Sequence, residues 1–225
     1  MHIEPGIAQG AKLLLGFGTA LTAGGLVLRQ FREFLVQYGL STLLGRTICT
    51  SLLVFSFFEI LPSTQVGVSE VHLILGSTLF LLFGLVSTAF GLAIGLLAQG
   101  TLMVPWDLPQ YGMNVTTLLL PLFLVSAVAE RIIPRMTAYQ NLSYGQVLQL
   151  SLVYQGGIVS WVAFWAFYGQ GFGAENIVQV LSFGAAYLTV IVLEPLINLG
   201  LLAGVKAFPA LNSSSLLSRR LFQPA

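Results

Sequence analysis

Two residues at the start of the chain could together bind a metal ion. The chain begins with Met1 and His2, which offer three nitrogens: the terminal amine, the backbone nitrogen of His2 and the Nδ1 of its ring. We expect the methionine to be retained, because the bulky histidine follows it directly. These nitrogens can form two fused chelate rings and leave one position of a square for a fourth ligand. Late divalent ions such as Ni²⁺ and Cu²⁺ suit such nitrogen sites best.

The chain offers one further imidazole as the fourth ligand. Its sequence has two histidines, His2 and His72. Seventy positions separate them, so they do not form the compact motif that metal sites usually show. His2 as a solvated terminal residue and His72 as a polar residue at a membrane interface explain the same pattern. The residues alone leave both interpretations open.

The composition indicates an integral membrane protein. Hydrophobic residues make up 56% of the 225 residues and charged residues 8%, and the mean hydropathy is +0.89. Such values are not those of a soluble domain. The formal net charge of +1 argues against a nucleic-acid partner, which would require a basic face. The lipid bilayer is therefore the expected surroundings.

Apolar stretches divide the chain into membrane-spanning segments, most of them about 20 residues long, enough to cross about 30 Å of hydrocarbon. We expect an all-α fold of about seven transmembrane helices, at roughly residues 7–28, 41–61, 71–83, 85–103, 113–129, 146–168 and 177–205. The third is short, and its boundary near Gly84 follows from the need for an odd number of crossings.

The basic residues predict the orientation of these helices. Seven of the nine lie between or after the spans, on one side: Arg29, Arg32, Arg131, Arg135, Lys206, Arg219 and Arg220. Basic loops stay in the cytoplasm, which puts the amino terminus outside and the carboxyl terminus in the cytoplasm. We expect one transmembrane domain over residues 1–208, with a metal-binding amino-terminal loop, and a loosely ordered cytoplasmic tail over residues 209–225.

Two acidic residues fall within predicted spans. Glu59 and Glu194 would be costly in hydrocarbon, so they should face protein or water. Glu59 lies near the outer end of its span, at about the depth of His72. It either contacts the metal or belongs to a polar network, and its position favours the network.

Two other classes of function compete with metal binding. An intramembrane metalloprotease needs His and Glu clustered at helical spacing, which this sequence does not show, so we expect no enzyme and no catalytic cofactor. A multi-pass membrane scaffold or assembly factor would bind no solute. The placement of His2 and His72 at one predicted depth argues against a scaffold.

Several short motifs in the sequence match the pattern of one known family. They are Met1-His2-Ile3 followed by Gly6, Val71-His72-Leu73, Gln99 at the end of a span, and Gly112-Met113-Asn114 at the start of the next. In these motifs, which cover roughly the first 130 residues, the chain resembles the CbiM/NikM family. Its members are the substrate-binding membrane subunits (S components) of energy-coupling factor transporters, an ABC type of importer, for cobalt and nickel.

The resemblance implies a site, a substrate and partners. The metal ligands would be the amine of Met1, the backbone nitrogen and Nδ1 of His2, and His72, with Gln99 and Asn114 in supporting roles. Glu59 is a further candidate for a supporting role because of its depth, not because of the resemblance. The substrate would be Ni²⁺ or Co²⁺. Partners would be energy-coupling ATPase subunits, a transmembrane coupling protein and a small accessory membrane subunit, in a bacterial cytoplasmic membrane.

Overall fold

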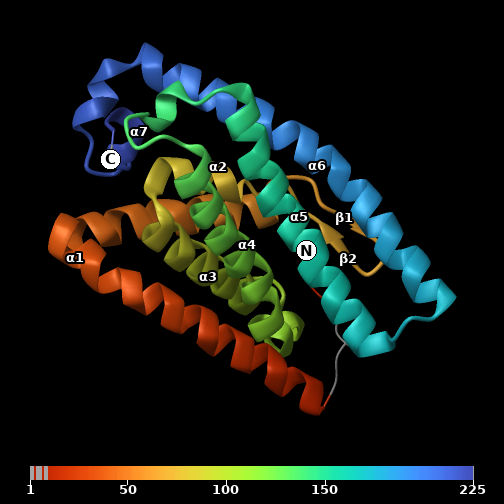
Figure 1. Cartoon of the computed structure of the whole chain (residues 1–225). Helices are drawn as coiled ribbons and strands as arrows, with labels where there is room; N and C mark the ends of the chain where they lie inside the picture. Colours follow the sequence, from red (N-terminus) through yellow and green to blue (C-terminus); the bar gives the residue numbers. More distant parts are fainter. Residues whose placement is uncertain (1–2, 4–6, 8–9, 225) are drawn as a thin grey trace.

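The computed structural model describes residues 3, 7 and 10–224 and shows a bundle of helices with one small β-hairpin (Figure 1). Within this part of the chain, five helices are long and apolar enough to cross a membrane: α1 (Ala11–Glu59), α3 (Leu85–Leu102), α4 (Tyr111–Ile132), α5 (Tyr144–Gln170) and α6 (Ala174–Ala207). The shorter elements are β1 (Thr64–Val66), β2 (Ser69–Val71), α2 (Gly76–Phe83), η1 (Pro105–Gln110), η2 (Tyr139–Asn141), η3 (Pro209–Ser213) and α7 (Arg219–Phe222).

Helix α1 contains the first two predicted spans. It bends back on itself at Gly39, whose φ of 79° and ψ of 167° are not helical (Figure 1). Such a positive φ favours glycine, which has no Cβ. The first arm continues as helix through Arg29 and Glu33, so the loop expected there was wrong. The turn lies several residues later, and the charged residues occupy the end of the helix before it.

The region of the third predicted helix differs most from expectation. The boundary at Gly84 is confirmed, because its φ of 82° separates α2 from α3. However, residues 64–66 and 69–71 form an antiparallel hairpin, and α2 has only eight residues. At 1.5 Å per residue it is about 12 Å long, too short to cross the membrane. The two arms of α1 and helices α3 to α6 account for the other six predicted spans.

Small residues allow the long helices to approach closely. A Cβ added to Gly91 would lie 2.1 Å from the Oγ1 of Thr50, so α3 lies directly against the second arm of α1. Likewise, a Cβ on Gly112 would lie 2.8 Å from the backbone of Gly16, where α4 crosses the first arm. Close backbone approach of this kind stabilises helix pairs in lipid, where no hydrophobic drive acts between them.

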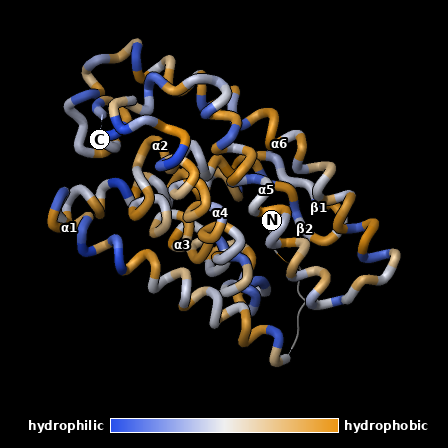
Figure 2. Tube along the Cα trace, in the orientation of Figure 1, coloured by the Kyte–Doolittle hydropathy of each residue, from blue (hydrophilic) through white to orange (hydrophobic). Residues whose placement is uncertain are grey.

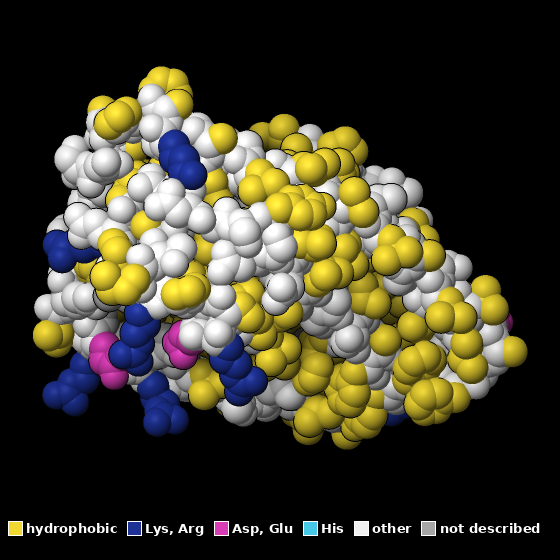
Figure 3. All heavy atoms as spheres, turned by 45° about the horizontal axis from the view of Figure 1, so that its top comes forward, with side chains coloured by type: hydrophobic (Ala, Val, Ile, Leu, Met, Phe, Trp, Pro, Cys, Tyr) yellow, Lys and Arg dark blue, Asp and Glu magenta, His cyan; other side chains and the backbone are white. Residues whose placement is uncertain are grey.

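The surface divides into an apolar region and a basic end. Hydrophobic residues recur along the long helices (Figure 2) and cover much of the surface, whereas Lys and Arg gather at one end (Figure 3). Lys12 is an exception, since its Nζ donates hydrogen bonds of 2.9 Å to the carbonyls of Tyr168 and Gly169 at the end of α5. A cation suits the negative end of a helix dipole.

The tail is packed against the helices rather than loosely ordered as expected. Leu221 is fully buried, and the backbone N–H of Ser218 donates a 2.7 Å hydrogen bond to the carbonyl of Leu82 at the end of α2. Arg220 donates from Nη2 to the carbonyl of Pro134 at 3.1 Å. Residues far apart in the sequence are therefore joined at the basic end.

Candidate metal site

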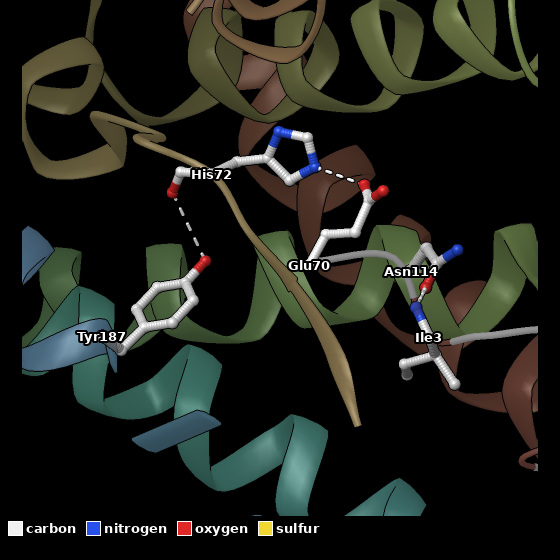
Figure 4. Close-up of polar contacts among 5 residues, drawn as sticks. All are labelled: Ile3, Glu70, His72, Asn114 and Tyr187. Atoms are coloured by element: carbon white, nitrogen blue, oxygen red, sulfur yellow. Dashed lines mark hydrogen bonds and ion pairs between the residues drawn. The ribbon is translucent and has the colours of Figure 1, made fainter. Parts of the chain in front are cut away.

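His72 lies in the short segment between β2 and α2, in the half of the bundle away from the basic end (Figure 1). Its side chain is 2% exposed, and its Nε2 lies 2.8 Å from the Oε2 of Glu70 (Figure 4). The ring also packs edge-on against Phe58 from the last turn of α1, with 5.1 Å between ring centroids. These two contacts fix the orientation of the imidazole.

The surroundings keep the His72 ring in the form that binds metal. Burial lowers its pKa to about 4, although the carboxylate of Glu70 acts in the opposite direction. A neutral imidazole is the form that coordinates a metal ion. Because a carboxylate only accepts hydrogen bonds, Nε2 carries the proton and the ring lone pair is on Nδ1. A carboxylate on the second ring nitrogen is the arrangement that orients histidine ligands in many metal sites.

The segment that follows the predicted chelating residues is held close to this histidine. Ile3 is fully buried, and its backbone N–H donates a 2.8 Å hydrogen bond to the Oδ1 of Asn114 in α4 (Figure 4). Ile3 also forms an antiparallel bridge with Ser69, three residues before His72. The other two predicted ligands, Met1 and His2, lie outside the described residues.

Two of the three predicted supporting residues lie together around a cavity that the third does not line. Gln99 and Asn114 are both buried and line one small cavity between α3, η1 and α4. The Oε1 of Gln99 accepts no hydrogen bond from any described residue. Glu59 ends α1 with an exposed side chain, so its role beside the metal stays a prediction. Among residues 3, 7 and 10–224, no three His, Cys, Asp or Glu side chains gather as a metal site.

A comparison with family models decides the identity. The model of the cobalt uptake substrate-specific transmembrane region, CbiM, matches residues 2–210. The chain belongs to the CbiM family. The match extends well beyond the first 130 residues, where the sequence motifs lie. No curated protein and no solved structure matches the chain.

Membership in the CbiM family confirms several predictions. The chain is a multi-pass integral membrane component of a cobalt uptake transporter, and the family is not enzymatic. Five helices of suitable length and composition agree with this assignment. Cobalt is therefore a substrate to be carried rather than a catalytic cofactor.

The residue that sequence reasoning missed is Glu70. It precedes His72 by two positions, and in a strand residues two apart point to the same face. This spacing could have indicated a carboxylate and imidazole side by side, but the segment was expected to be a loop that leads into a helix. Recognition of the hairpin was the missing step.

The segment between β2 and α2, which carries His72 in this CbiM protein, is hydrogen-bonded to helices α5 and α6. The hydroxyl of Tyr187 in α6 lies 3.5 Å from the carbonyl of His72 (Figure 4), and Gln155 in α5 donates from Nε2 to the carbonyl of Ile74 at 2.8 Å. Both donors are fully buried. The backbone beside the histidine is thus fixed by α5 and α6.

Glu194 in α6 extends this support to the start of α2. Its carboxylate is fully buried and accepts hydrogen bonds from the N–H and Oγ of Ser77 at 3.0 and 2.8 Å. It also accepts from Ser151 Oγ at 2.6 Å and from Gln155 Nε2 at 2.9 Å. The expectation that this acid faces protein is confirmed. Gln155 donates to both Glu194 and the carbonyl of Ile74. The network therefore joins α2, α5 and α6 to the segment that carries His72.

Replacement of Glu194 by alanine should destabilise the protein. The donors on Ser77, Ser151 and Gln155 would lose their shared acceptor, and unsatisfied buried donors are costly, so we expect a loss of about 2–4 kcal/mol in the free energy of unfolding. Unfolding of the purified protein in mixtures of a mild detergent and dodecyl sulfate measures this free energy. Glu194→Gln, which keeps one acceptor oxygen, should lose less, and Glu33→Ala on the exposed face of α1 should change little. A Glu194→Ala variant as stable as the parent would contradict this role.

Proposed function

We propose that this CbiM protein captures Co²⁺ or Ni²⁺ at the hairpin end of the bundle and releases it on the opposite side. The observation that carries the proposal is the position of Ile3, which Asn114 and Ser69 hold beside the strand that leads to His72. His2 directly precedes Ile3, and consecutive Cα atoms are about 3.8 Å apart. The anchored Ile3 thus limits how far the chelating residues can lie from His72.

The direction of the bridge supports the same ligand set. An antiparallel pairing that continued past Ile3 would place the residues before it alongside those after Ser69, which are Glu70, Val71 and then His72. The amine of Met1 and the backbone nitrogen and Nδ1 of His2 would then meet the imidazole of His72. Asn114 would orient the terminus through Ile3, and Gln99, in the same cavity as Asn114, would support it.

The choice between the two metals follows from two arguments. Four nitrogen ligands in a square favour Ni²⁺ over Co²⁺ in the Irving–Williams order. The family description names cobalt. We therefore propose that the site binds both ions, and that delivery of Co²⁺ is the physiological function.

Transport requires partners and an orientation. The sequence contains no G-x-x-x-x-G-K-[ST] motif for nucleotide binding, so energy must come from other subunits. By family, these are ATPase subunits, a transmembrane coupling protein and a small accessory membrane subunit. The basic end of the molecule (Figure 3) would lie in the cytoplasm by the positive-inside rule, with the hairpin end and His72 outside.

Metal titration of the purified protein tests this function. We expect calorimetry on detergent-purified protein with its native amino terminus to give one site per chain with a Kd of about 10⁻⁶ M or tighter for Co²⁺ and Ni²⁺. Mg²⁺ should not bind, because it prefers oxygen ligands. A membrane scaffold would bind none of the three ions. Equal binding of Mg²⁺ would also rule out the nitrogen site.

A further inference from the structure

The bend of α1 and the carboxyl-terminal tail lie next to each other at the basic end of the molecule (Figure 1). Residues of both segments line a polar cavity there. Its volume is about 380 Å³, room for a phosphate group and several waters. Arg46 and Arg219 line it, together with Tyr38 and Thr42 of α1 and the hydroxyls and amides of residues 212–215 and 223. None of the lining residues is acidic.

The two arginines are unusually placed for like charges. The Arg46 guanidinium lies 5.3 Å from the centroid of the Tyr38 ring, and the Arg219 guanidinium lies 5.5 Å from the same centroid. One aromatic ring therefore contacts both cations. Two positive charges held around one ring repel each other, and the cost is larger where water is excluded. An anion between them would remove this cost.

Arg46 is buried without a carboxylate partner in the part of the chain that the structure describes. It is 2% exposed, and its hydrogen bonds go to the neutral carbonyls of Ser215 (2.9 Å), Leu217 and Phe83 (3.5 Å). Buried charges in proteins are normally paired with an opposite charge. A guanidinium has five N–H groups, so these three bonds do not use all of its donors.

The start of a helix beside the cavity also favours an anion. The second arm of α1 begins after Gly39, and Thr42, in its first turn, lines the cavity. The first N–H groups of a helix have no partner within the helix and carry a partial positive charge. The planar fork of arginine matches phosphate oxygens well. The cavity thus has guanidinium and hydroxyl groups in its lining and lies beside the start of a helix.

We propose that this cavity binds a phosphate group, and that its natural source is the headgroup of an anionic phospholipid. Exposed apolar residues on α1 flank the bend, with Val36 85%, Leu40 57% and Leu44 52% exposed. This apolar surface would accept acyl chains while the headgroup phosphate enters the cavity. Basic cavities at the cytoplasmic surface are known to attract anionic headgroups. Arg46 already donates hydrogen bonds to the tail, and the bound lipid would stabilise the contact between the tail and the bend of α1.

Native mass spectrometry of the full-length protein tests the proposal. The protein released from detergent would be titrated separately with phosphatidylglycerol, with phosphatidylcholine and with inorganic phosphate. We expect one tightly bound phosphatidylglycerol, and a loss of affinity of at least about tenfold in Arg219→Gln, since a charge-assisted hydrogen bond contributes about this much. Arg135→Gln is the matched control, because Arg135 is an exposed arginine at the same end that does not line the cavity.

The outcomes separate the sources of phosphate. Binding of inorganic phosphate, but not of phosphatidylglycerol, with the same sensitivity to Arg219→Gln would keep the site and assign it to a free phosphate. Equal losses in Arg219→Gln and Arg135→Gln would show that only the overall charge matters, and would overturn the proposal. Binding of neither ligand, or equal binding of phosphatidylcholine, would overturn it too. Arg46→Gln is left out because Arg46 also holds the tail.

Discussion

A variant with one extra residue before Met1 is expected to bind Co²⁺ at least about a hundredfold more weakly than the native chain. The extra residue turns the primary amine of Met1 into a peptide nitrogen and moves the free amine one residue further from His2, so the amine, His2 and His72 can no longer surround the ion together. Co²⁺ is the ion for this comparison, because a free amine two residues before a histidine forms a strong Ni²⁺ chelate of its own. Removal of an outer-shell partner costs about ten- to a hundredfold in metal affinity, and loss of a ligand should cost more. Calorimetric titration of the two proteins side by side measures the difference.

The control for this experiment carries the same extra residue after the last residue of the chain, Ala225. It should bind both ions with native affinity, since the carboxyl-terminal region lies at the basic end, away from His72. We expect Ile3 to keep its hydrogen bond to Asn114 in every version, because the addition lies two residues before it. Equal affinity in the native and amino-terminally extended proteins would mean that the amine is not a ligand.

Much of the fold could be predicted because a bilayer imposes length and polarity on each crossing. The spans near residues 113–129, 146–168 and 177–205 lie within α4, α5 and α6, and Gly84 separates two helices as expected. The hairpin could not be predicted in this way. Its turn packs so closely on α6 that a Cβ at Gly67 would lie 2.0 Å from the carbonyl oxygen of Gln179. Such contacts depend on tertiary structure, which hydropathy does not record.

The candidate site, like the fold, could be predicted only in part. His72 is the second imidazole of the sequence, and Gln99 and Asn114 belong to the family motifs; the structure places all three in buried positions, with Gln99 and Asn114 around one cavity. The groups that hold them in place were not identified. Glu70 required knowledge of the strand, and the partners of Glu194 come from α2 and α5. Sequence motifs therefore point to candidate ligands more readily than to the groups that would orient them.

Replacement of His72 by alanine should abolish high-affinity binding of Co²⁺ and Ni²⁺, with a loss of at least about a hundredfold by the same argument as for the amine. The sequence holds no imidazole besides His2 that could replace it. The ring is buried against Phe58, so alanine also leaves a cavity, which costs stability. Calorimetry would be combined with thermal unfolding in the absence of metal.

His72→Gln separates loss of a ligand from loss of structure. Glutamine nearly fills the space of the ring and can donate a hydrogen bond to Glu70, so it should unfold close to the parent temperature and still fail to bind metal tightly. Glu175→Gln is the matched control at the same end of the bundle, because Glu175 is exposed in the first turn of α6 and should leave affinity unchanged. Native affinity in a folded His72→Gln protein would remove His72 from the site. Loss of affinity in it alone, while Glu175→Gln binds normally, would support His72 as the fourth nitrogen.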